Sequence, residues 1–152
     1  MNARIPIALL AIASVFASGV TESKGTTIEL SITGPDLEAP LHSRDKLLTS
    51  ANVWFGGIFD PESGPLDTTA DESSDYRIHF WVQFSQGDIQ MKYFVWYRWD
   101  ADSDRAIVCL PGETDPWYFV NVYSIFRGDE GSCLYANEEW GRAVKSILLD
   151  SE

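Results

Sequence analysis

The sequence has little of what metal centres and redox motifs are built from. It contains only two cysteines and two histidines among 152 residues, and the cysteines are too far apart for a CxxC pair. A GxSxG nucleophile elbow, an HExxH zinc motif, a P-loop and a GxGxxG turn are also absent from the sequence. We therefore assign no catalytic residue, no cofactor and no metal site.

Long hydrophobic runs are also missing. The longest, residues 5–17, is interrupted and falls short of the about 20 apolar residues that a membrane-spanning helix needs. Arg4 precedes this run, and small residues near Ala17 suit a signal-peptidase cut. We expect a signal peptide at residues 1–17 and a periplasmic or secreted protein without membrane insertion. Residues 18–152 then form a single domain.

Basic residues are scarce. There are 11 lysines and arginines against 23 aspartates and glutamates, which gives a net charge of −12. Such a chain repels phosphate backbones, so we expect no nucleic-acid partner. A cationic envelope or extracellular protein is the candidate partner, although the same charge also serves plain solubility. The stretch from Asp60 to Asp75 has six acidic residues and no basic one, and we interpret it as a mobile, solvated loop.

The middle of the chain predicts a β-hairpin. Residues 76–85 and 89–99 are rich in aromatic and β-branched residues, and a polar turn separates them. If Ser85 faces Asp88, one face carries only apolar and aromatic pairs, which are Phe84–Ile89, Val82–Met91, Phe80–Tyr93, Ile78–Val95 and Tyr76–Tyr97. The second face then carries Gln83–Gln90, Trp81–Lys92, His79–Phe94 and Arg77–Trp96. A one-residue slip would destroy the apolar match, so the pattern favours this register.

Further strands and one helix complete the predicted fold. Alternating apolar residues indicate strands at 26–33, 106–110 and 117–126, so the hairpin continues as an antiparallel meander. Asn137 caps a C-terminal helix with the apolar stripe Trp140, Val144, Ile147 and Leu148. The fold class is α+β, an antiparallel β-meander sheet with one C-terminal helix packed on it. We expect the helix to cover the second face, which Val120 and Val122 make apolar at its far end.

Cys109 and Cys133 are the one cysteine pair that the chain offers. In an exported protein two cysteines favour a disulfide, and two partly buried thiols are the alternative. The bridge would close a loop of about 24 residues and stabilise the fold by roughly 3 kcal/mol in the chain-entropy model.

The second face of the hairpin is the candidate binding surface. It sets cations against indoles in the pairs Arg77–Trp96 and Trp81–Lys92, and exposed tryptophans often anchor partners. A sugar ring can stack on such a surface, so a glycan is a second candidate partner. The alternative is that these pairs only stabilise the sheet. A small carboxylate-dependent hydrolase is the alternative function, although no pair stands out among 23 acids.

Asp100, Asp102 and Asp104 have the spacing of the first ligands in a calcium loop. Such a loop also needs Gly at its sixth place and Glu at its twelfth, where this chain has Arg105 and Pro111. We interpret the segment as a hairpin turn and expect no tight calcium site.

Several segments together resemble an uncharacterised family of small exported bacterial proteins. They are GPxLxxP at 34–40, NxW at 52–54 and LPG…PWYxxN at 110–121, with the terminal helix around Trp140. The resemblance implies a bacterial envelope or secreted protein. Because its motifs are glycine, proline and aromatic residues that form turns and cores, it implies no catalytic residue.

Overall fold

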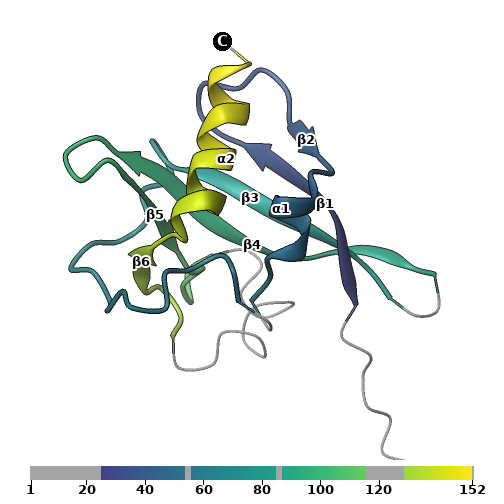
Figure 1. Ribbon diagram of the computed structural model, residues 1–152, viewed down its shortest axis with the longest axis horizontal. Helices are drawn as coiled ribbons and strands as arrows, with labels where there is room; N and C mark the ends of the chain where they lie inside the picture. Colours follow the sequence, from purple (N-terminus) through teal and green to yellow (C-terminus); the bar gives the residue numbers. More distant parts are fainter. Residues whose placement is uncertain (1–24, 54–55, 85–86, 116–128, 152) are drawn as a thin grey trace, which may run out of the picture.

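One antiparallel sheet and two helices make up the part of the chain that the computed structural model describes, which is residues 25–53, 56–84, 87–115 and 129–151 (Figure 1). The elements are β1 (Thr26–Thr33), β2 (Leu41–Ser43), α1 (Lys46–Ser50), β3 (Tyr76–Gln83), β4 (Ile89–Asp100), β5 (Arg105–Cys109), β6 (Cys133–Tyr135) and α2 (Glu138–Leu149). The strand order is β2-β1-β3-β4-β5-β6, so β1 joins the meander beside β3. The predicted α+β class is confirmed.

Two predictions from the sequence lie outside the described residues. They are the signal peptide at 1–17 and the strand at 117–126. Neither helix in the described residues is long and apolar enough to cross a membrane.

The β3–β4 hairpin has the predicted register only in part. The partners of the five residues from Tyr76 to Phe80 are those predicted. Beyond Phe80 a β-bulge leaves Lys92 without a partner on β3, so Trp81 pairs with Met91. The predicted pair Trp81–Lys92 and the pairs nearer the turn are therefore wrong by one residue. A count from the turn treats every residue of β4 as paired with a residue of β3. The bulge leaves one residue of β4, Lys92, without such a partner.

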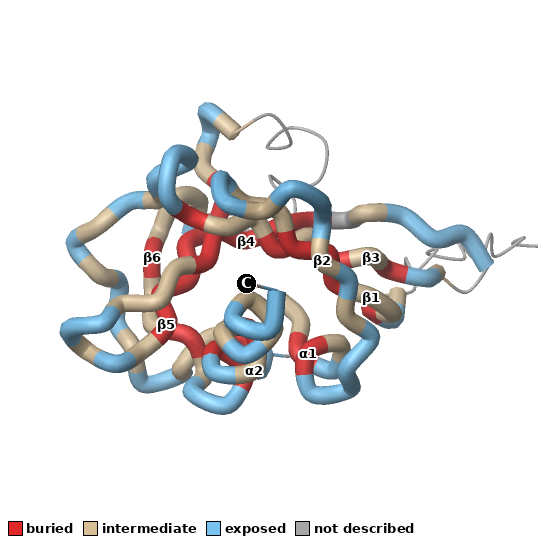
Figure 2. Tube along the Cα trace, turned by 90° about the horizontal axis from the view of Figure 1, so that it is seen from above, coloured by how far each residue is buried: buried red, intermediate tan, exposed pale blue. Residues whose placement is uncertain are grey.

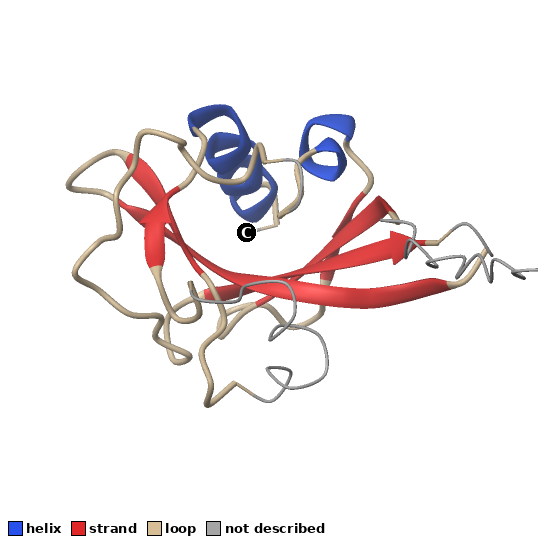
Figure 3. Cartoon of the chain, turned by 90° about the horizontal axis from the view of Figure 1, so that it is seen from below, coloured by secondary structure: helices blue, strands red, loops and turns tan. Residues whose placement is uncertain are grey.

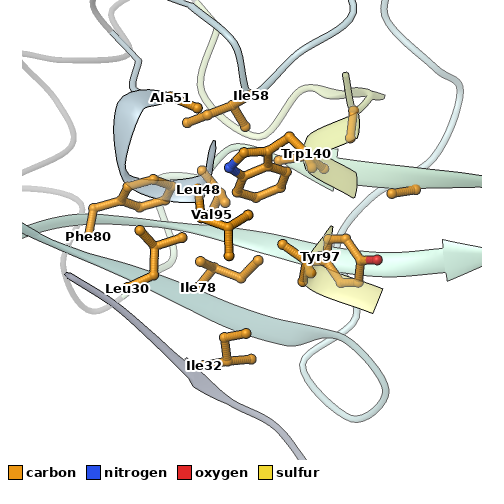
Figure 4. Packing of buried hydrophobic residues seen from close by; sticks show 14 of the residues in the cluster. Leu30, Ile32, Leu48, Ala51, Ile58, Ile78, Phe80, Val95, Tyr97 and Trp140 are labelled. Atoms are coloured by element: carbon orange, nitrogen blue, oxygen red, sulfur yellow. The ribbon is translucent and has the colours of Figure 1, made fainter. Parts of the chain in front are cut away.

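Both helices cover the first face of the sheet (Figure 3). Leu48 of α1 and Trp140 of α2 pack on apolar strand residues there (Figure 4). These strand residues are Leu30, Ile32, Ile78, Phe80, Tyr93, Val95, Tyr97, Ala106 and Val108. Val144 of α2 belongs to the same cluster. The expectation that the C-terminal helix covers the second face is wrong. A helix with one apolar stripe covers one face, and the first face offers the larger apolar cluster.

The second face has a smaller cluster of its own, which we call the second cluster. Its buried residues are Phe94, Trp96, Ile107, Cys109 and Cys133. Leu66 and Ala70 pack against it from residues 60–75, the segment that we call the strap. The prediction that this whole segment is solvated is therefore wrong, because part of it covers the sheet. Figure 2 shows β4 buried along its middle, as both covered faces require.

The predicted disulfide is confirmed. Cys109 of β5 lies directly opposite Cys133 of β6, and their sulfur atoms are bonded. Both residues are buried, with exposed fractions of 1% and 0%. The bridge therefore ties the short strand β6 covalently to the sheet.

Candidate functional site

Two of the four predicted binding residues, Arg77 and Trp96, lie together on the second face. The Cζ atom of Arg77 is 4.5 Å from the ring centroid of Trp96 and 5.8 Å from that of Phe94. Phe94 and Trp96 meet edge to face, with their centroids 5.6 Å apart. Trp96 is only 4% exposed, so the expectation of an exposed tryptophan anchor at this position is wrong. Its indole belongs to the second cluster.

The other two predicted residues are placed differently. Trp81 is half-buried, and its indole N–H donates a 2.9 Å hydrogen bond to the hydroxyl of Ser31 on β1. The bulge takes Lys92 out of register with Trp81, and the Lys92 side chain lies outside the described part of the structure. The structure thus brings together Arg77 and Trp96 but does not form the predicted pair of Trp81 and Lys92.

Three arginines connect the second face to the strap. They come from three neighbouring strands, and each forms an ion pair with a different strap carboxylate. The pairs are Arg77–Glu72, Arg98–Asp75 at 2.9 Å and Arg105–Asp60 at 2.6 Å. The guanidinium of Arg105 also lies 4.2 Å from the ring centroid of Tyr135. Ion pairs therefore hold the acidic strap to a row of three arginines, one each on β3, β4 and β5.

Asp75 is the buried member of this row, with 2% of its surface exposed. Its carboxylate accepts hydrogen bonds from the Arg98 guanidinium and from the backbone N–H of Asp71, both at 2.9 Å. Arg98 also donates to the Thr68 hydroxyl at 2.7 Å and to the Thr69 carbonyl at 3.0 Å. A buried charge is costly unless it is paired, so this network fixes the end of the strap.

The remaining acids of the strap face outward. Glu62, Asp67 and Asp71 are exposed, and none of them forms an ion pair within the described residues. By contrast, each of the five described arginines is paired with a carboxylate of the chain itself. The outer surface of the strap therefore presents negative charge.

Hydrogen bonds lower the pKa values of two strap carboxyls, Asp60 and Asp71. The Arg105 side chain, followed by the Glu62 backbone N–H, lowers the pKa of Asp60. The hydroxyl and backbone N–H of Ser73 lower the pKa of Asp71. Because both pKa values lie below the ordinary range of aspartate, both groups are charged at neutral pH.

The Asp100–Asp104 turn uses its carboxylates internally. Asp100 accepts a hydrogen bond from the backbone N–H of Asp102 at 3.2 Å, and Asp104 pairs with Arg142 at 3.2 Å. Within the described ranges no group of three or more His, Cys, Asp or Glu side chains is placed to hold a metal ion. The lack of a tight calcium site stays a prediction.

No family model matches the chain, and comparisons with curated proteins and with solved structures also found no match. The family resemblance of the glycine, proline and aromatic segments therefore stays a prediction.

The arginine row is the feature that sequence reasoning missed. The alternation that places Arg77 on the second face also places Arg98 and Arg105 there. An acidic stretch without a basic residue leads directly into β3, the first of these strands. Three arginines of one parity beside such a stretch are the signal that predicts the strap as a cover.

Proposed function

We propose that this protein is an exported, non-catalytic binding domain of the bacterial envelope or secreted fraction, and that its strap contacts a cationic protein partner. One observation carries the proposal. Every described arginine is neutralised by a carboxylate of the same chain, whereas the outer carboxylates Glu62, Asp67 and Asp71 face solvent. A surface charged in this way attracts a basic partner and speeds its association.

The way in which the strap is held also favours binding. The inner carboxylates Asp60, Glu72 and Asp75 anchor it to the sheet, so the outer ones are presented from an ordered segment. An ordered loop loses less conformational entropy when a partner binds. The Cys109–Cys133 disulfide is compatible with an oxidising compartment outside the cytoplasm.

The alternative of a carboxylate-dependent hydrolase has less support. A general acid of that kind needs a carboxyl whose pKa is raised toward neutrality. The described carboxyls with clearly shifted pKa values are Glu29, Asp60, Asp71 and Asp100, and hydrogen bonds lower the pKa of each. A glycan has less support too, because stacking needs an exposed ring and Trp96 is buried.

Affinity capture tests the proposal. The mature protein, residues 18–152, is immobilised and exposed to envelope and secreted extracts, and bound proteins are identified by mass spectrometry. The strap variant Glu62→Gln/Asp67→Asn is compared with Asp102→Asn/Glu113→Gln, which removes equal charge from exposed sites elsewhere. We expect the wild-type protein to capture a basic protein that elutes when the salt concentration is raised. The control variant should capture the same protein, and the strap variant should not. Capture that is the same with both variants, or no capture at all, would count against the proposal.

A further inference from the structure

The strap is hydrogen-bonded to β6, the last strand of the described sheet, which also carries the disulfide. The backbone N–H of Leu66 donates to the Cys133 carbonyl at 2.8 Å, and that of Asp60 donates to the Tyr135 carbonyl at 3.0 Å. The Tyr135 N–H in turn donates to the Ser63 hydroxyl at 3.1 Å. β6 has only three residues, and the disulfide crosslinks the first of them to β5. The position of the strap therefore depends on how firmly β6 is held.

The disulfide in turn depends on the strap. Cys109 and Cys133 are buried in the same cluster against which Leu66 and Ala70 of the strap pack. Reduction of a disulfide requires a thiolate to reach one of its sulfur atoms. A reductant therefore needs the cover of this cluster to move.

The strap can move without disturbing the apolar core on the first face. Its attachments are hydrogen bonds and three ion pairs, and the second cluster is contacted by only two half-buried apolar residues of the strap, Leu66 and Ala70. The first-face core, with both helices, does not include the strap. Segments with few buried apolar contacts open locally at lower free energy than the core.

We propose that the strap and the disulfide form a redox-sensitive cover over the second cluster, in which Phe94 and Trp96 lie under Arg77. The reductant is a dithiol. One of its thiolates attacks a sulfur of the bridge, which breaks the S–S bond, releases one cysteine as a thiolate and leaves a mixed disulfide with the other. The second thiol of the reductant then attacks its own sulfur in the mixed disulfide and releases the remaining cysteine. Two electrons and two protons pass to Cys109 and Cys133, which become thiols, and the dithiol becomes a disulfide. β6 is then held without its crosslink, the strap opens more often, and the aromatic cluster becomes accessible.

Hydrogen exchange of the full mature protein tests the first half of this coupling. Oxidised protein is compared with protein reduced by dithiothreitol. We expect the amides of Asp60 and Leu66, which bond to β6, to exchange at least about tenfold faster after reduction. The Gly141 amide, which donates to the carbonyl of the α2 N-cap Asn137, should keep its rate. An equal acceleration of all three amides would show uniform destabilisation and overturn the proposal, as would no acceleration.

Reduction kinetics test the other half, because a strap that opens more often lets a thiolate reach the buried sulfur atoms sooner. Asp60→Asn removes the pair with Arg105 and loosens the strap, so dithiothreitol should reduce the disulfide several-fold faster than in the wild-type protein. Asp104→Asn is the matched control, since it removes the pair with Arg142 away from the strap. Its reduction rate should equal that of the wild type. Equal rates in the two variants would contradict the coupling. Neither experiment involves a partner, so both outcomes are independent of the proposed function.

Discussion

At the scale of single residues, the two tryptophans that the sequence places on one binding face differ in burial. Trp96 is 4% exposed and packs with Phe94 under Arg77. Trp81 is half-buried and bonded to Ser31. Their replacement should therefore have different consequences for the fold.

Trp96→Ala should lower the free energy of unfolding by about 3–5 kcal/mol, because it leaves a cavity in the second cluster. Trp81→Ala should cost clearly less, because part of the ring is already in water. Urea denaturation of both variants measures the two losses. Equal and small losses would mean that Trp96 is not packed in a core.

His79 should make stability depend on pH. Burial, and then the charge of nearby Arg77, lowers its pKa to about 4. In the unfolded chain its pKa is about 6.5. As the pH falls from about 6.5 to about 4, His79 becomes protonated in the unfolded state but stays neutral in the native state. The free energy of unfolding should therefore decrease from about pH 6.5 down to about pH 4.

The His79→Gln variant separates this effect from that of the carboxyls. Carboxyls with lowered pKa values, such as Asp60, cost stability only once the pH nears their unfolded pKa of about 4. Denaturation of both proteins at several pH values should show that the wild type loses stability between about pH 6.5 and about pH 4. The variant should keep its stability over this range. Parallel curves would contradict the assigned pKa of His79.

At the scale of elements, alternation along the strands predicts most of the fold. The apolar pairs from Tyr76 to Phe80 specify the register of β3 and β4, and Asn137 caps α2 as expected. The bulge at Lys92 could not be predicted, because apolar and polar residues alternate without a break from Ile89 to Tyr93, whereas an extra residue shifts the faces by one. The side of α2 could not be predicted either. An apolar stripe shows that a helix is amphipathic but does not show which face it covers.

Gly141 shows why helix propensity alone misleads within α2. Glycine in a helix costs up to about 1 kcal/mol relative to alanine. A Cβ at Gly141 would lie 2.7 Å from the Cβ of Ala106 on β5, closer than side chains pack. The Gly141 carbonyl also accepts a 2.8 Å hydrogen bond from the Tyr97 hydroxyl. The glycine therefore allows α2 to lie close to the sheet.

Gly141→Ala should accordingly destabilise the protein by roughly 1–3 kcal/mol, as overpacking does. Ser146→Ala, at an exposed position of the same helix, should be neutral or slightly stabilising. Thermal unfolding compares the two variants. A higher melting temperature for Gly141→Ala would show that α2 does not approach β5 so closely.

At the scale of the whole molecule, the sheet is covered in two different ways. Helices bury the first face through apolar contacts, whereas an acidic strap covers part of the second face through arginine pairs. Composition predicts the acidic stretch but not its anchoring, because the pairing depends on strands that come later in the chain. The same arrangement leaves the outer carboxylates of the strap available to a basic partner.

An NMR titration of the isotopically labelled mature protein with a short lysine-rich peptide tests the central claim, that the strap is the surface for a cationic partner. Chemical-shift changes should concentrate in residues 60–75 and weaken as salt is raised. Amides near Glu138 and Glu139, which are also exposed and acidic, should change little. Changes spread evenly over all acidic sites, or centred on α2, would contradict the claim.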